Sequence, residues 1–342
     1  MLPPMKYFYF SIFVVAFTDV SAQDPSFSQI ENTLLNSHPS FTSGYDYNLG
    51  TALRVQWPKI PGGFNTAFLT FNGNLHKGLS LGLSYIRDQE GVGNIGIMKT
   101  DEPKLIVRYR CTPIKKDQYL TGSLSFGPVF KQINSSELIF SDQIDPVLGI
   151  SDQPVFTYAN KSFFDCDASI NYFINGKFPC LFAFSVHHLT NPDESLLPES
   201  ESILPPKVIF TYSSRQLWEK EENSLYLDGV FQIEFQKQLQ KMIIGPLMTI
   251  PAGEHKIPIG LFYSGQHNAF NSDNTNSLIL ELGFHFYDLN QGEKKYYSYQ
   301  TLNLSFDWPC TGMAFRGTTG SYELTWNFYF GKCKNCYSGI KK

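Results

Sequence analysis

Residues 321–330 read SYELTWNFYF, and an aromatic or aliphatic side chain stands at every second position. Side chains two residues apart project from the same face of a β-strand, so this stretch predicts a strand with one apolar face and one polar face. The apolar face carries Tyr322, Leu324, Trp326, Phe328 and Phe330, and the polar face carries Ser321, Glu323, Thr325 and Asn327.

The alternation recurs along most of the chain. Residues 164–174 set Phe164, Ile170 and Tyr172 against Asp165 and Asp167. The chain also holds 30 phenylalanines and 19 tyrosines, and aromatic side chains favour strands over helices. The pattern predicts an all-β protein with fourteen strands, at 47–57, 64–72, 78–87, 103–111, 118–130, 161–174, 178–190, 206–214, 225–235, 239–250, 255–265, 276–287, 295–306 and 320–330.

A β-sandwich also alternates, so the lengths of the connections decide between a sandwich and a membrane barrel. If the first strand rises from the periplasm, the periplasmic connections are mostly short, at 73–77, 112–117, 175–177, 251–254 and 288–294. The opposite connections include long ones at 88–102, 131–160, 191–205, 266–275 and 307–319, although 215–224 and 236–238 break the rule. Short turns on one side and long loops on the other predict a single antiparallel transmembrane β-barrel of an outer membrane, spanning 47–330.

One predicted hairpin allows a statement about register. A three-residue loop at 175–177 places Tyr172 opposite Cys180 and Ile170 opposite Phe182, so that apolar side chains meet on the lipid face. The same register places Cys166 opposite Val186. Cys166 and Cys180 are then too far apart to form a disulfide.

The ends of the chain lie outside the predicted barrel. Residues 1–22 resemble a signal peptide, with a basic start, an apolar run at 7–17, and small residues before a cleavage site between Ala22 and Gln23. The alternative of an uncleaved anchor helix is disfavoured, because a spanning helix needs about 20 apolar residues. Residues 23–46 are expected to form a periplasmic N-terminal segment, and residues 331–342 a C-terminal tail. The tail contains Cys333 and Cys336, which lack the further ligands of a zinc site and predict a disulfide or free thiols.

No constellation in the sequence predicts catalysis, a metal or a cofactor. The acidic residues on the polar strand faces are expected to pair with arginines or to contact water inside the barrel. His187 and His188 are neighbours in a predicted strand, so they should point to opposite faces and not share a metal. Ser80 stands in a Gly-x-Ser-x-Gly string (78–82), which keeps a hydrolase open as an alternative, but the string lies within a strand and not at a strand-to-helix turn. The net charge of −4 gives no basic footprint for nucleic acid. The acidic residues expected to pair with arginines or to contact water are Asp165, Asp167, Glu234, Glu281 and Glu323, and the arginines are Arg54, Arg108 and Arg110.

Four short stretches resemble the PorP/SprF family of Bacteroidota. They are QDPSFSQ at 23–29, SVHHLTNPDES at 185–195 followed by Leu204-Pro205, YSYQ at 297–300 and SYELT at 321–325. Departures from the family pattern are a lengthened stretch at 35–40, Gln300 in place of Asp, and Tyr322 in place of His. The positions that match the family motifs are Asp24, Pro25, Phe27, Ser28, Gln29, His188, Leu189, Pro192, Tyr297, Ser298, Tyr299 and Glu323.

The resemblance implies an outer-membrane component of the type IX secretion system that supports secretion and surface anchoring of large cargo proteins, such as gliding adhesins. The implied partners are outer-membrane lipid, other secretion components, the cargo, and periplasmic envelope proteins. The last strand also resembles the signal read by the barrel-assembly machinery, although twelve residues follow Phe330. A passive channel for small solutes remains the alternative, because the polar strand faces would line a lumen.

Overall fold

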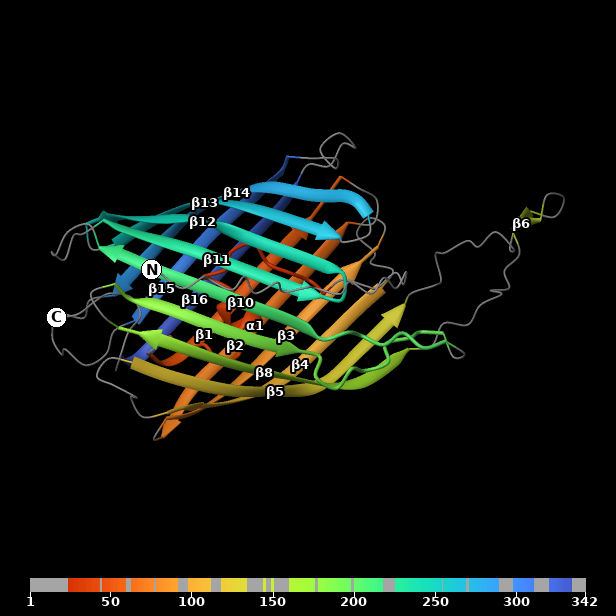
Figure 1. Cartoon of the computed structure of the whole chain (residues 1–342), viewed down its shortest axis with the longest axis horizontal. Helices are drawn as coiled ribbons and strands as arrows, with labels where there is room; N and C mark the ends of the chain where they lie inside the picture. Colours follow the sequence, from red (N-terminus) through yellow and green to blue (C-terminus); the bar gives the residue numbers. More distant parts are fainter. Residues whose placement is uncertain are drawn as a thin grey trace, which may run out of the picture.

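Fourteen strands form a closed antiparallel barrel in the computed structural model (Figure 1). The structure describes residues 24–43, 45–59, 63–76, 78–91, 98–111, 118–133, 144–145, 149–150, 160–175, 178–197, 200–217, 225–253, 255–268, 271–288, 298–310 and 320–333. The barrel strands are β1 (Tyr45–Gln56), β2 (Phe64–His76), β3 (Leu79–Glu90), β4 (Met98–Arg110), β5 (Gln118–Ile133), β8 (Lys161–Ile174), β9 (Cys180–His187), β10 (Lys207–Leu217), β11 (Tyr226–Gln236), β12 (Leu239–Ala252), β13 (His255–Asn268), β14 (Asn271–Asp288), β15 (Ser298–Pro309) and β16 (Ser321–Cys333).

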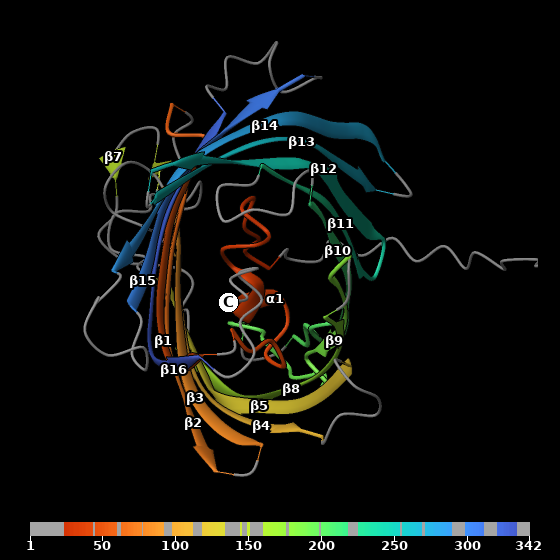
Figure 2. The same ribbon diagram turned by 90° about the vertical axis from the view of Figure 1, so that its left-hand side faces the viewer.

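Each barrel strand pairs with its neighbours along the chain, and β1 pairs with β16 to close the ring (Figure 2). The short strands β6 (Ile144–Asp145) and β7 (Gly149–Ile150) form a separate two-stranded sheet. The predicted barrel of fourteen strands is therefore confirmed.

The two faces of each strand follow the predicted alternation. In β16, Leu324 keeps 42% of its surface exposed while the next residue, Thr325, is fully buried. The outer wall carries exposed leucines and aromatic residues all around the ring, and most of the buried polar residues lie on the inner face. A wall that exposes its apolar side chains and buries its polar ones is stable in lipid and not in water.

The longest connections lie at one end of the barrel, the long-loop end, although β11–β12 and β13–β14 are joined there by only two residues each. The opposite end is the short-turn end. At the short-turn end, two residues each connect β2 to β3 and β12 to β13. At the long-loop end, residues 134–160 connect β5 to β8 and residues 188–206 connect β9 to β10. The predicted long connection at 266–275 is wrong, because β13 and β14 extend through most of it and leave only 269–270 between them. Both strands remain hydrogen-bonded there, with Asn268 opposite Asn271.

The predicted hairpin register is wrong by two residues. Tyr172 pairs with Phe182 and Ile174 with Cys180, because β9 begins only after Pro179, which has no N–H to donate to a ladder. A shift of two keeps each side chain on its predicted face. Cys111, Cys166, Cys180 and Cys310 are free thiols, as expected for Cys166 and Cys180.

The N-terminal segment, residues 24–43, lies inside the barrel (Figure 2), whereas the sequence analysis placed it in the periplasm. It includes the short helix α1 (Leu34–Ser37). No helix among the described residues is long and apolar enough to cross a membrane. The segment runs from the long-loop half of the lumen, where Asp24 contacts the end of β9, to the short-turn end, where β1 begins.

Candidate functional site

An apolar patch on the inner wall explains why the N-terminal segment occupies the lumen. The inner faces of β9 and β11–β14 carry buried aliphatic and aromatic side chains, and Ile30 and Leu34 of the segment pack against them. Phe27 packs in the same way against Ala52 and Phe68 of β1 and β2. Covering this surface removes it from water, which favours the buried position of the segment. The wall residues of the larger patch are Leu181, Val230, Ile243, Leu247, Phe262 and Ile279.

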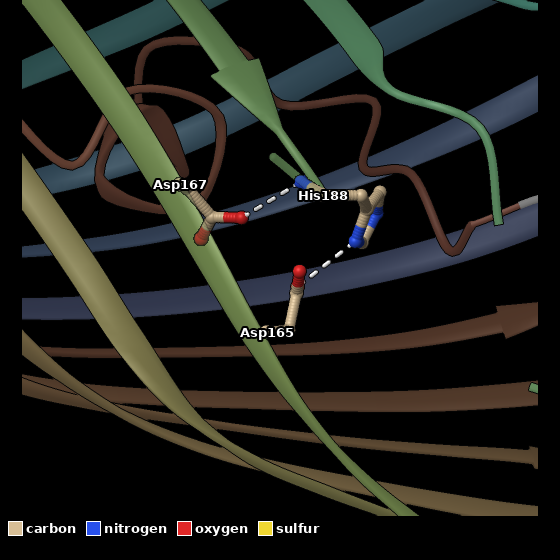
Figure 3. A group of neighbouring side chains, drawn as sticks. All are labelled: Asp165, Asp167 and His188. Atoms are coloured by element: carbon tan, nitrogen blue, oxygen red, sulfur yellow. Dashed lines mark hydrogen bonds and ion pairs between the residues drawn. The ribbon is translucent and has the colours of Figure 1, made fainter. Parts of the chain in front are cut away.

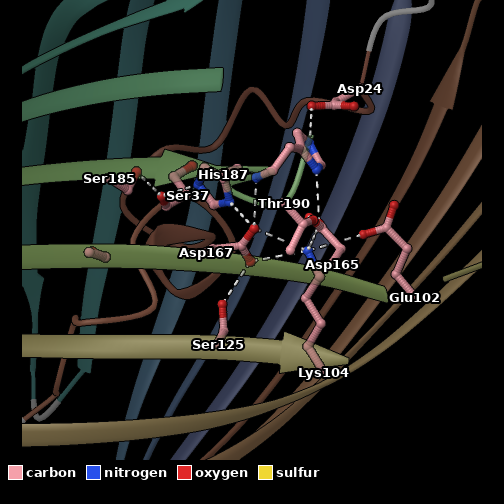
Figure 4. Close-up of polar contacts among 12 residues, drawn as sticks. Asp24, Ser37, Glu102, Lys104, Ser125, Asp165, Asp167, Ser185, His187 and Thr190 are labelled. Atoms are coloured by element: carbon pink, nitrogen blue, oxygen red, sulfur yellow. Dashed lines mark hydrogen bonds and ion pairs between the residues drawn. The ribbon is translucent and has the colours of Figure 1, made fainter. Parts of the chain in front are cut away.

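Five residues at the front of the segment and the facing wall form an ion cluster (Figure 3, Figure 4). This Asp24 cluster comprises Asp24, Lys104, Asp165, Asp167 and His188. His188 Nε2 lies 2.8 Å from Asp24 and His188 Nδ1 lies 2.9 Å from Asp165, so the ring bridges the segment and β8. The Lys104 ammonium donates to Asp165 at 2.8 Å and to Asp167 at 3.0 Å.

The charges of the Asp24 cluster stabilise one another. Burial alone would lower the pKa of His188, but Asp24 and Asp165 outweigh it and raise that pKa to about 10. Burial would also raise the pKa of Asp24, and His188 instead holds it well below its usual value. The imidazolium of His188 and the carboxylate of Asp24 are therefore charged at neutral pH. The cluster is a clamp between the segment and the wall.

Asp165, Asp167 and His188 lie close enough together to suggest a metal site. The Lys104 ammonium already contacts both carboxylates, and both ring nitrogens of His188 are engaged with carboxylates. A metal would require a neutral imidazole with a free nitrogen. The same engagement leaves neither nitrogen available as a general base. The residues present fit an ion-pair clamp and not a metal or a catalytic centre.

The expectation that His187 and His188 point to opposite faces is wrong. β9 ends at His187, and His188 adopts a positive φ of 59°, which turns the chain so that both side chains are buried. The rings lie 6.3 Å apart, and His187 contacts Asp167 at 3.5 Å and the carbonyl of Ser37 at 2.9 Å. The rule for alternating faces fails here because it applies only while the strand continues.

A second group, the seam cluster, ties the segment to the strands that close the ring. It comprises Ser28, Gln29, Arg54, Asp307 and Glu323. Arg54 of β1 pairs with Asp307 of β15 at 2.7 Å and with Glu323 of β16 at 3.0 Å. The backbone N–H groups of Ser28 and Gln29 donate to Glu323 at 2.7 and 3.1 Å. The cluster therefore joins the first strand, the last two strands and the segment.

Gln29 is fully buried and uses its whole side chain at this seam. Its amide nitrogen donates to the carbonyl of Glu323 at 2.9 Å, and its amide oxygen accepts from Thr325 at 2.6 Å. Nearer the short-turn end, Arg108 and Arg110 donate to the carbonyl of Pro39 and the hydroxyl of Thr42. These two arginines were expected to pair with carboxylates, and they hold the segment instead.

The acidic residues of the inner wall bind several kinds of partner. Glu323 pairs with Arg54 as expected, whereas Asp165 and Asp167 pair with Lys104, which the sequence analysis missed. Lys104 and Arg108 stand four residues apart in β4, so both side chains point inward. This spacing could have identified Lys104 as a partner for the acidic residues of the inner wall. Further, Glu234 pairs with Lys207 at 3.3 Å, and Glu281 accepts from Asn32 of the segment at 2.8 Å.

The remaining predicted site residues lie apart from these clusters. Ser80 is buried in β3 and donates to Asn74 at 2.6 Å, so the Gly-x-Ser-x-Gly string lies in a strand as interpreted. The residues of the barrel-assembly signal lie in β16, where Phe330 stacks on Tyr47 of β1 with ring centroids 5.2 Å apart. Ser298 and Tyr299 begin β15, Pro192 is buried in the loop after β9, and Leu189 is exposed there. The predicted positions outside the described residues are Ala22, Gln23, Tyr297 and Cys336.

Small cavities lie between the segment and the wall. One of about 100 Å³ lies towards the short-turn end and is lined by Glu31, Tyr45, Arg215 and Glu281 among others. A second, of about 60 Å³, lies beside the Asp24 cluster. A volume of this size holds a few water molecules or one small group.

Three solved structures have some likeness to this chain. A FadL homologue of Pseudomonas aeruginosa is 9% identical with a TM-score of 0.44, covering 84% of this chain and 89% of its own. A bacterial polysaccharide outer membrane secretin is 5% identical with a TM-score of 0.42, covering 86% and 100%. A loop-deletion mutant of OmpT, an outer membrane protein of Vibrio cholerae, is 8% identical with a TM-score of 0.38, covering 83% and 97%.

No curated protein matches the chain. A family model does: that of the type IX secretion system membrane protein PorP/SprF matches residues 19–328, which include both clusters and the whole N-terminal segment. The closed barrel with its apolar outer wall is an outer-membrane structure, as the resemblance implied. The chain belongs to the PorP/SprF family of type IX secretion system membrane proteins.

Proposed function

We propose that this protein supports the secretion and surface anchoring of large type IX cargo proteins as a closed membrane scaffold. The observation that carries the proposal is the occupied lumen. Residues 24–43 fill the barrel from the long-loop half to the short-turn end and are held by the Asp24 and seam clusters. A scaffold acts through its surfaces and needs no continuous passage, so a filled barrel suits it.

The same observation disfavours the alternative of a passive channel. The segment leaves cavities of about 100 and 60 Å³ beside it, whereas a passive channel for solutes needs a continuous aqueous path. The proposed partners are outer-membrane lipid around the apolar wall, the other components of the secretion system, a large cargo, and periplasmic proteins that contact the short-turn end.

Deletion of the gene tests the role in secretion. We expect the deletion strain to lose surface display of a large secreted adhesin, and a plasmid copy of the gene to restore it. The adhesin is followed by antibody labelling of intact cells, and total adhesin in lysates serves as the control for expression. Normal display in the deletion strain would contradict the proposal.

Conductance separates the scaffold from the channel. We expect the purified barrel in planar bilayers to give no steady open-state current, because the segment blocks the lumen. A variant lacking residues 24–43 that still reaches the membrane provides the matched comparison. A large steady current from the wild-type protein would favour the passive channel.

A further inference from the structure

His188 belongs to two parts of the molecule at once. It is the first residue of the outer loop, residues 188–206, which connects β9 to β10 at the long-loop end. Its side chain is also the clamp between Asp24 of the N-terminal segment, at 2.8 Å, and Asp165 of β8, at 2.9 Å. Figure 3 shows the contact with Asp165. Its φ of 59° is a backbone conformation that few residues other than glycine adopt. The position of this ring therefore depends on how the outer loop leaves the strand.

The outer loop is folded and fastened to the rim of the barrel. Asp193 and Ile203 form a β-bridge, and the N–H of Leu204 donates to the carbonyl of Pro192 at 2.9 Å. Two ion pairs join the loop to neighbouring strands: Lys161 of β8 contacts Asp193 at 2.6 Å, and Lys131 of β5 contacts Glu194 at 2.7 Å. These pairs hold the loop against the rim.

The front of the N-terminal segment is held less extensively than the part behind it. Asp24 contacts His188 and Gln236, and Ser26 accepts from Lys241 at 2.6 Å. The cavity of about 60 Å³ separates this front from the wall. From Ser28 onwards the seam cluster and the apolar patch fix the segment. A local opening would therefore involve residues 24–26 and leave the rest of the segment in place.

We propose that the outer loop and the front of the N-terminal segment form one latch. Displacement of the loop withdraws His188 from Asp24 and frees residues 24–26 from the wall.

The test measures access to the front of the segment when only the loop is changed. A variant without the six natural cysteines receives the near-isosteric S26C substitution, and its reaction with a membrane-impermeant maleimide is followed in proteoliposomes. K131A/K161A releases the loop from the rim without touching the Asp24 cluster, and H188A removes the clamp itself. We expect both to raise the labelling rate on the order of tenfold or more, because each favours local opening.

R87A is the matched control. It also breaks an ion pair between a basic side chain and a carboxylate, but this pair lies on the outer wall, where Arg87 contacts Asp101 at 2.7 Å. We expect it to leave the labelling rate unchanged. If K131A/K161A does not fold, the milder D193N/E194Q removes the same two pairs from the loop side. An increase with H188A but none with either loop variant would overturn the coupling. No increase with H188A would overturn the latch.

Discussion

Replacing Arg54 by alanine should weaken the barrel at the seam where its first and last strands meet. The guanidinium pairs with Asp307 at 2.7 Å and Glu323 at 3.0 Å, and all three side chains are at most 9% exposed. Removing one partner of a buried ion pair leaves the other charge uncompensated and costs about 3–5 kcal/mol. Here two carboxylates lose the same partner. We therefore expect R54A to lower the free energy of unfolding by at least that range.

The control is an ion pair of similar geometry in a different surroundings. Arg87 and Asp101 form two hydrogen bonds of 2.7 and 3.1 Å, but the Arg87 side chain is 51% exposed. Arg87 stands three residues before the long-loop end of β3, so we expect it to meet water and not hydrocarbon. Pairs exposed to water contribute about 0–1 kcal/mol, because solvent screens them and the side chains lose freedom. R87A should therefore cost much less than R54A, although the two pairs have similar lengths.

The assay is reversible urea unfolding in lipid vesicles, followed by tryptophan fluorescence, with heat-modifiable migration on gels to verify that the variants are folded. A further variant, S28A, tests whether the N-terminal segment shares in the seam. Residues in one network couple by about 0.5–3 kcal/mol, so the effects of R54A and S28A should not add. Equal costs for R54A and R87A would refute the reasoning from burial. Additive effects of R54A and S28A would refute a shared network.

Three further expectations rest on other parts of the chain. At Gly245, a Cβ would lie 2.2 Å from a backbone oxygen of β13, so G245V should cost about 1–3 kcal/mol, whereas G122A, with no atom within 4 Å, should be nearly neutral in the same unfolding assay. The pKa of His188 is raised to about 10, so its contribution to the free energy of unfolding should be complete below about pH 6.5 and lost as the pH rises through 10. If the free energies of unfolding of wild type and H188A differ by the same amount from pH 5 to 11, this expectation is contradicted. Cys166 and Cys180 are free, so oxidised and reduced protein cut between them should release two fragments alike, and linked fragments would show a disulfide.

The barrel could be predicted from the sequence because alternation is a local property. The alternation within each strand shows which of its faces meets lipid. The predicted register was wrong by two residues, since Tyr172 pairs with Phe182 and not with Cys180, but a shift of two leaves every side chain on the same face. The register itself was not predictable, since it depends on where β9 begins after Pro179. The turn at His188 was missed for the same reason. Its positive φ ends the strand at His187, three residues before the predicted end at 190.

The N-terminal segment could not be placed by periodicity, because residues 24–43 contain no regular strand and only one short helix. A signal for it nevertheless exists in the wall. In β12 the outward residues Met242 and Ile244 are apolar, but so are Ile243 and Leu247, which point inward. A strand that is apolar on both faces is covered on both sides. The inner cover had to come from the chain itself or from a partner, and it is Ile30 and Leu34 of the segment.

The motif positions of the family acquire a common explanation from these contacts. Asp24 and His188 lie 164 residues apart in the chain and meet in the Asp24 cluster, and Ser28 and Gln29 meet Glu323 across a separation of 294–295 residues. Three of the four motif stretches thus contribute to the attachment of the N-terminal segment and not to a catalytic centre. Because one attachment lies at the seam that closes the barrel and the other at the root of the outer loop, the segment connects closure of the ring with the surface that faces outward.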